Sequence, residues 1–336
     1  MINRFLESFH KSIANYNYDL KSKHWENFLK KKYTDINVDK IINFRNNGLS
    51  DGMDNVRMKE NVEFNNQTFQ EFKKFLIKQN KKIDEFEKYF PKKNVGNCTN
   101  QIIYKNYFLD NILIRHLIMY LDISEFVLKK FNNINVCEIG GGFGSLARII
   151  MNNQKTKYFL IDLPEANLLS SYYLSEHFKN KKIFTYKDCV GDKITKKDVS
   201  NFDIIIIPPW VKFDDIEINL FINTKSMMEM NFSTIEDYFK IIQKNISSDG
   251  FFYNCNRYYK DTVGHAIELH KYPYDNLWKT IISKPAWSQR RLHIILTQRS
   301  VRKLDDIKNL KKEIKIISKN HTPHILQKIR KLIKIF

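Results

Sequence analysis

A glycine-rich segment between an apolar run and a helical pattern constrains the fold of this chain more than any other feature. Residues 140–144 contain four of the ten glycines in the sequence. Glycine adopts positive φ angles and lets a ligand approach the backbone, at an entropic cost that a surface turn rarely repeats. Residues 135–139 predict a short buried strand, and residues 145–150 begin a helix. We therefore expect the first strand-to-helix turn of a doubly wound α/β sheet, with a ligand on the glycines.

Two classes of cofactor bind to a turn of this kind. Gly142, Gly144 and Ala147 fit the glycine spacing of a dinucleotide fingerprint, and Asp162 follows at the distance where a ribose hydroxyl needs an acceptor. Glu138 favours the second class, because a carboxylate at the strand end repels a pyrophosphate and attracts the cationic amino-acid end of S-adenosylmethionine. A glycine-rich turn without a ligand is the remaining alternative.

Four segments of the sequence carry a family resemblance. Residues 138–144 resemble the first motif of class I S-adenosylmethionine-dependent methyltransferases, and residues 159–164 resemble their second strand, which ends in the acid that binds the ribose. Residues 223–230 and 250–257 are similar to segments of a bacterial family of sugar O-methyltransferases found in surface-polysaccharide gene sets. The resemblance to the class covers about residues 130–300, and it implies a Rossmann-like seven-stranded sheet in the order 3-2-1-4-5-7-6.

The strand and helix patterns divide the chain into three parts. Residues 1–95 predict a helical N-terminal region or lid, residues 96–300 the S-adenosylmethionine-binding domain, and residues 301–336 a basic helical tail. Strands are expected at 135–139, 157–161, 182–186, 203–207, 251–255, 278–283 and 292–298, with helices between them and an antiparallel pair at the end. Residues 323–336 are apolar on one face and basic on the other, so this helix is expected to lie on an anionic membrane surface or to dock on a protein.

The formal net charge of +19 raises the alternative of a nucleic-acid methyltransferase. Residues 299–336 contain twelve Lys or Arg against three acids, a net charge of +9 that is nearly half of the total. The remaining charge is spread over the rest of the chain, so nucleic acid is disfavoured as a partner. The four cysteines are widely spaced, no C-x-x-C pair marks a metal site, and no apolar run approaches the ~20 residues of a membrane span. We expect a cytoplasmic protein without a metal, peripheral to the inner membrane if the tail binds there. Oligomerisation is compatible with the sequence.

The residues after each predicted strand are expected to bind the cofactor. Asp162 is expected to accept both ribose hydroxyls, although it can also cap the helix that begins at Pro164. Asp188 and Cys189 are expected to meet the adenine, with an exposed turn as the alternative. The complete predicted cofactor set is Glu138, Gly140, Gly142, Gly144, Asp162, Leu163, Asp188, Cys189 and Pro208.

Ile207-Pro208-Pro209-Trp210 is similar to the Asn/Asp-Pro-Pro-aromatic motif of adenine N-methyltransferases, except at its first residue. Those enzymes need a polar side chain there to accept hydrogen bonds from the amine, and Ile207 has no acceptor. Amine methylation is therefore disfavoured. Trp210 is expected either to pack in the core or to lie against a sugar ring.

Methylation of an alkyl hydroxyl requires a base, because the pKa of such a hydroxyl lies far above 7. The candidates are Glu229, in an otherwise apolar stretch, and His265, which follows the fifth predicted strand, although either can be a structural polar residue. The predicted substrate-binding residues are Arg45, Trp210, Asn254, Asn256 and Arg257. We therefore predict an O-methyltransferase acting on a sugar hydroxyl of a surface-polysaccharide precursor. An RNA methyltransferase and a non-catalytic homologue that binds the cofactor are the alternatives.

Overall fold

The computed structural model describes residues 1–16, 25, 29, 32–50, 53, 60–261, 263–287 and 289–321. The helix predicted at residues 323–336 lies outside this range, and its membrane contact stays a prediction. No helix in the described part of the chain is long and apolar enough to cross a bilayer.

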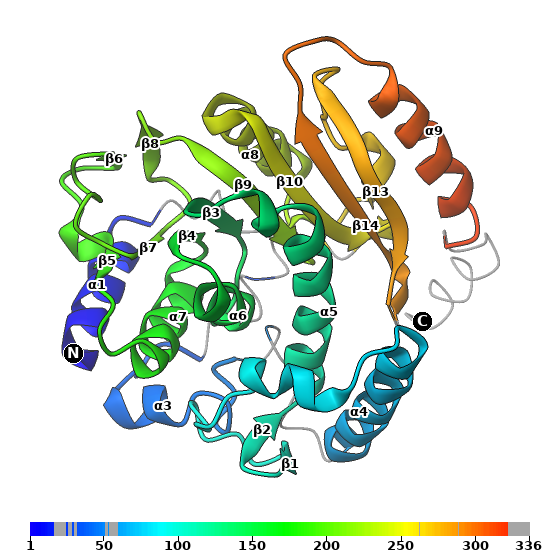
Figure 1. Ribbon diagram of the computed structural model, residues 1–336. Coiled ribbons are helices and arrows are strands. Elements are labelled where there is room, and N and C mark those ends of the chain that lie inside the picture. Colours follow the sequence, from blue (N-terminus) through cyan, green and yellow to red (C-terminus); the bar gives the residue numbers. More distant parts are fainter. Residues whose placement is uncertain are drawn as a thin grey trace, which may run out of the picture.

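An eight-stranded sheet forms the centre of the molecule, in the order β13-β14-β10-β9-β3-β4-β7-β5 (Figure 1). Its strands are β3 (Ile134–Ile139), β4 (Thr156–Ile161), β5 (Ile183–Thr185), β7 (Ile204–Ile207), β9 (Ile218–Thr224), β10 (Ile246–Arg257), β13 (Trp278–Ala286) and β14 (Gln289–Arg299). The strands from β5 to β10 are parallel, and β14 runs antiparallel to β10 and β13. The prediction of an α/β fold with a mostly parallel sheet and an antiparallel edge is confirmed.

The predicted number and order of the strands are wrong, because the sheet has eight strands rather than seven and its order differs at two places. The strand at residues 204–207 lies between β4 and β5 rather than beside β3, and β9, which was predicted to be helical, pairs with β3 and β10 instead. Asn219 and Asn223 interrupt the apolar pattern of β9. Both amides are satisfied by the backbone of β3, because Asn219 accepts from Asn135 N–H at 2.9 Å and Asn223 donates to Ile139 C=O at 2.8 Å. Long-range pairing therefore places these polar residues in a buried strand, a choice that local pattern does not predict.

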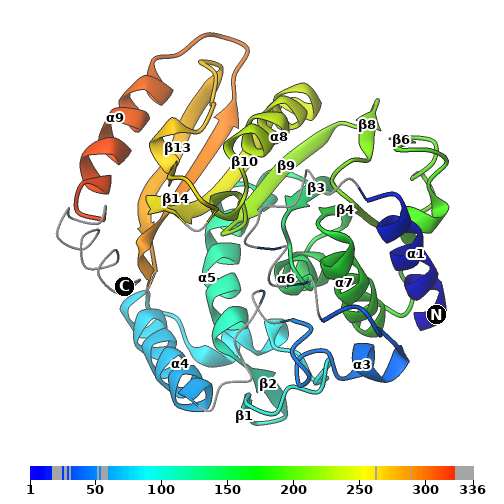
Figure 2. The ribbon, with the colours of Figure 1, turned by 180° about the vertical axis from the view of Figure 1, so that it is seen from behind.

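Helices cover both faces of the sheet (Figures 1 and 2). They are α1 (Ile2–Ala14), α3 (Val38–Ile42), α4 (Glu60–Lys78), α5 (Asn111–Phe126), α6 (Ser145–Asn153), α7 (Pro164–His177), α8 (Phe232–Asn245) and α9 (Asp306–Ser318). Residues of α5, α6 and α7 pack on one face of the sheet, whereas residues of α8 and α9 pack on the other. Both faces of β3 and β4 are covered, which explains why five of the six residues in each strand are buried.

The N-terminal helices share a core with the sheet. Phe5 and Phe9 of α1, together with Phe72 of α4, belong to the same buried cluster as Val136 of β3. Figures 1 and 2 show α1 beside β5 and β7 at one edge of the sheet and α9 beside β13 at the other edge. Residues 1–95 therefore pack directly on the α/β unit in the described part of the chain.

Short elements complete the structure. The small strands are β1 (Ile102–Tyr104), β2 (Tyr107–Leu109), β6 (Lys193–Thr195), β8 (Lys212–Asp214), β11 (Tyr259–Lys260) and β12 (Ile267–Glu268). The 3₁₀ turns are η2 (Ile83–Tyr89), η3 (Leu128–Lys130), η4 (Tyr186–Asp188), η5 (Met227–Glu229) and η6 (Leu269–Lys271). Of these, η5 and β11 bear directly on the site described next.

Candidate functional site

A cavity of about 340 Å³ lies at the carboxyl ends of β3, β4, β9 and β10. This is the edge at which open parallel sheets bind ligands. Its walls come from the glycine turn, the end of β4, the segment after β9, helix α5 and the N-terminal region. The lining includes Trp25, Leu29, Met53, Asn111, Arg115, His116, Gly140, Gly141, Gly142, Asp162, Leu163, Pro209, Lys225, Ser226, Glu229, Tyr238 and Arg257.

The glycine turn has no room for side chains at two positions. Gly140 has a φ of +74°, and a Cβ there would lie 2.1 Å from Ser226 Oγ. A Cβ on Gly141 would lie 2.9 Å from the carboxylate of Glu138. The backbone of the turn is therefore packed against β9 and Glu138 on one side and forms the cavity wall on the other.

Glu138 is a buried acid at the end of β3, beside Gly141. Its Oε2 accepts a hydrogen bond from the Tyr158 hydroxyl at 2.7 Å, and Glu138 as a whole is 1% exposed. Burial raises the pKa of Glu138 to about 7, the Tyr158 hydrogen bond opposes this, and the charge of Asp162 adds to it. Glu138 does not itself line the cavity, because it lies behind Gly141, so its role in binding the cofactor stays a prediction.

Asp162 lines the cavity at the end of β4. Its carboxylate accepts the backbone N–H groups of Gly142 at 2.8 Å and Leu163 at 2.7 Å. Burial raises the pKa of Asp162 to about 7, against the effect of these two hydrogen bonds. A carboxylate has about four acceptor positions, so two remain for the hydroxyls of a ligand.

Several residues predicted to bind the cofactor lie elsewhere. Asp188 Oδ2 accepts from Arg4 of α1 at 2.6 Å, and the backbone carbonyl of Cys189 accepts from Lys11 at 3.0 Å. These contacts hold α1 on η4, and neither residue lines the cavity. Gly144 packs against Leu174 of α7. At the end of β7 it is Pro209 rather than the predicted Pro208 that reaches the cavity.

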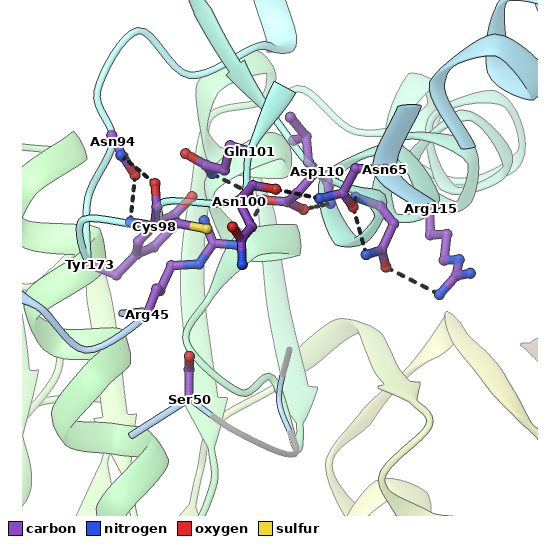
Figure 3. Close-up of polar contacts among 12 residues, drawn as sticks. Arg45, Ser50, Asn65, Asn94, Cys98, Asn100, Gln101, Asp110, Arg115 and Tyr173 are labelled. Atoms are coloured by element: carbon purple, nitrogen blue, oxygen red, sulfur yellow. Dashed lines mark hydrogen bonds and ion pairs between the residues drawn. The ribbon is translucent and has the colours of Figure 1, made fainter. Parts of the chain in front are cut away.

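Two predicted substrate residues also lie outside the cavity. Trp210 packs edge-on against Tyr16 and Tyr186, with ring centroids 5.3 and 5.7 Å away. The Arg45 guanidinium forms an ion pair with Asp110 at 2.7 Å, with both side chains 5% exposed (Figure 3). Asp110 also caps the first turn of α5, so Arg45 anchors its loop to that helix.

The amides of Asn254 and Asn256 form a buried chain behind the cavity wall. Asn254 donates to the Tyr274 hydroxyl at 2.9 Å, and Asn256 donates to Asn223 Oδ1 at 2.7 Å. Asn256 Oδ1 accepts the Met228 N–H at 3.1 Å. The chain therefore fixes the segment after β9, although neither residue lines the cavity.

The two predicted bases have different surroundings. Glu229 lines the cavity, and its Oε1 forms an ion pair with Lys260 of β11, whose side chain is 7% exposed. His265 is exposed between β11 and β12 and does not line the cavity. Of the predicted substrate residues, Arg257 at the end of β10 does line it.

Three basic residues of the cavity, Arg115, His116 and Lys225, are among the lining residues that the sequence did not predict. Burial lowers the pKa of His116 to about 3, and its Nδ1 has no hydrogen-bond partner. Lys225 has a φ of +63°, which is uncommon for a residue other than glycine. Adjacent Arg and His within the apolar residues 112–121 of α5 were the available signal, because charged residues in a buried stretch need a reason.

No protein-family model matches this chain, and no curated protein sequence does. Solved structures resemble it over about half of its length. A mitomycin 7-O-methyltransferase is 12% identical over 57% of this chain and 55% of its own, with a TM-score of 0.37. The magnesium protoporphyrin IX methyltransferase of Synechocystis PCC 6803, solved with bound S-adenosylmethionine, is 10% identical over 56% of this chain and 81% of its own, with a TM-score of 0.40. At these identities and scores, the likeness by itself assigns neither an activity nor a ligand.

Proposed function

We propose that this chain is an S-adenosylmethionine-dependent O-methyltransferase that methylates a hydroxyl of a sugar or a sugar-containing precursor. The observation that carries the proposal is the pair of acids at adjacent strand ends, Glu138 buried behind the glycine turn and Asp162 in the cavity wall. In this arrangement one carboxylate suits an ammonium and the other suits ribose hydroxyls.

The site fits this cofactor better than a dinucleotide. The glycines leave bare backbone at the cavity wall, so a ligand can lie against it. Burial raises the pKa values of Glu138 and Asp162 to about 7, and neither acid forms an ion pair with the described residues. A pyrophosphate would place negative charge beside these two acids, whereas the ammonium of S-adenosylmethionine would supply a countercharge. When bound, this cofactor supplies a methyl group on a sulfonium.

Glu229 is the proposed general base. Its carboxylate lies in the cavity wall, where it can take the proton of a substrate hydroxyl as the oxygen attacks. The ion pair with Lys260 holds the Glu229 side chain in one place. An amine substrate has less support, because it would need a free side-chain acceptor at a strand end. Asn223 Oδ1, at the end of β9, already accepts from Asn256 and from the Met227 N–H.

Transfer of a labelled methyl group from S-adenosylmethionine to a panel of sugars, sugar phosphates and uronic acids tests the proposal. Glu229→Gln should lower turnover by about 100-fold or more, as expected for a lost general base, and leave cofactor affinity unchanged. His265→Ala, outside the cavity, is the matched control and should keep wild-type turnover. Methylation of RNA but of no sugar would refute the assignment. Full turnover in Glu229→Gln would refute the role of this residue.

A further inference from the structure

Three cationic side chains line the cavity along with the glycine turn. Arg115 comes from α5, Lys225 follows β9, and Arg257 ends β10. β9 and β10 are parallel neighbours, and Lys225 N–H donates to the backbone carbonyl of Cys255 at 2.8 Å. Lys225 and Arg257 therefore leave the sheet at adjacent strand ends and face the same cavity.

None of the three forms an ion pair with a carboxylate of the described residues, although other inward-facing cations of this chain do. Arg45 pairs with Asp110, and Lys260 pairs with Glu229. Of the two acids in the cavity wall, Glu229 is thus already paired, and Asp162 accepts two backbone N–H groups. The Nε of Arg115 is buried without a hydrogen-bond partner, as is Nδ1 of His116.

The three cations are half-buried in the cavity wall. Burial and the charge of Arg115 together lower the pKa of Lys225 to about 8. Charges that are removed from water are normally paired or bound to a ligand, because desolvation costs several kcal/mol per ion (order of magnitude). An anion in the cavity would therefore pair with these cations.

Arg115 is held in position by a buried amide network (Figure 3). Its Nη1 donates to Asn111 Oδ1 at 3.3 Å, and its guanidinium lies 5.3 Å from the centre of the Phe64 ring. Asn111 in turn donates to Asn65 Oδ1 at 2.9 Å, and Asn65 donates to the backbone carbonyl of Asn100 at 2.8 Å. These contacts restrict the side chain, which lowers the entropy lost when it binds a ligand.

On the basis of the proposed function, we infer that the substrate carries an anionic group, a carboxylate or a phosphate, bound by Arg115, Lys225 and Arg257. Guanidinium groups bind both of these anions in bidentate geometry, and a lysine adds a point charge. A neutral sugar would enter the cavity and leave the three cations unpaired. The substrate class is therefore an acidic sugar, either a uronic acid or a sugar phosphate.

Calorimetric titration of the wild-type protein, saturated with S-adenosylhomocysteine, separates these ligands. The probes are glucuronate, glucose 1-phosphate and neutral glucose, at low and at high salt. At least one anionic probe should bind about tenfold or more tightly than glucose, as expected for charge-assisted hydrogen bonds. The tighter of the two anions identifies the carboxylate or the phosphate as the group recognised.

Substitutions then locate the binding site. Arg115→Gln and Arg257→Gln should each weaken the anionic probe by about tenfold, with the affinity for S-adenosylhomocysteine unchanged. Arg302→Gln removes an exposed arginine outside the cavity and is the matched control, which should bind as the wild type does. If glucose binds as tightly as both anions, or if both cavity variants keep anion affinity, the inference is wrong. If the wild type does not bind S-adenosylhomocysteine at all, the proposed function is wrong instead.

Discussion

Replacing Glu138 by Gln should stabilise the protein at alkaline pH and weaken the cofactor site. The native pKa of Glu138 is about 7 because of burial, whereas the unfolded value is 4.5. Between these values the folded chain holds a proton that the unfolded chain has released, so the free energy of unfolding falls as the pH rises. At about 1.36 kcal/mol per pKa unit, this loss reaches about 3 kcal/mol above pH 7.

The neutral amide of Glu138→Gln avoids this loss and still accepts the hydrogen bond from Tyr158. Urea unfolding followed by circular dichroism should therefore show a variant close to the wild type near pH 4.5 and more stable by about 3 kcal/mol at pH 8. Saturating S-adenosylmethionine should stabilise the wild type more than the variant. Glu236→Gln, at an exposed position, is the control and should show no such pH dependence. A variant that is less stable at pH 8, or equally shifted at both pH values, would refute the reasoning.

Two further substitutions test the scaffold of the site by urea unfolding. Gly140→Ala should lower the free energy of unfolding by about 2 kcal/mol or more, because its Cβ would lie 2.1 Å from the side-chain oxygen of Ser226. Gly191→Ala, with a similar φ and nothing within 4 Å of its Cβ, should lower it by about 1 kcal/mol. Equal losses would contradict this. Arg45→Met should lower the free energy of unfolding by about 3 kcal/mol, because it leaves the buried Asp110 carboxylate without a cation. Arg4→Met breaks a more exposed pair and should lower it by about 1 kcal/mol or less. A loss below about 1 kcal/mol in Arg45→Met would contradict the anchoring role of this pair.

The parts of the fold that local pattern encodes were predictable. Short, mostly apolar segments on either side of the glycine turn and its helix identified β3 and β4, and the glycines located the turn between β3 and α6. Asp162 followed from its place at the end of the second predicted strand, and the structure puts it in the cavity wall. These features depend on residues close together in the sequence, where periodicity and turn chemistry are informative.

Features that depend on long-range pairing were not predictable. Asn223 interrupts the apolar pattern of β9, and its amide is satisfied only in the folded chain, where it donates to the backbone of β3. Asp188 has the position of an adenine ligand in the strand pattern, but Arg4, far away in the sequence, binds it. Arg115 and His116 reach the cavity only because α5 packs beside the glycine turn. Each of these outcomes was decided by a partner that the local sequence does not contain.

The central claim is that the cavity binds S-adenosylmethionine, and isothermal titration calorimetry of the full chain tests it most directly. The wild type should bind S-adenosylmethionine with micromolar affinity and bind NAD far more weakly. Asp162→Asn should weaken the binding of S-adenosylmethionine by about tenfold, which is about 1.4 kcal/mol. Tight binding of NAD, or an affinity for S-adenosylmethionine that is undetectable or unchanged in Asp162→Asn, would contradict the claim.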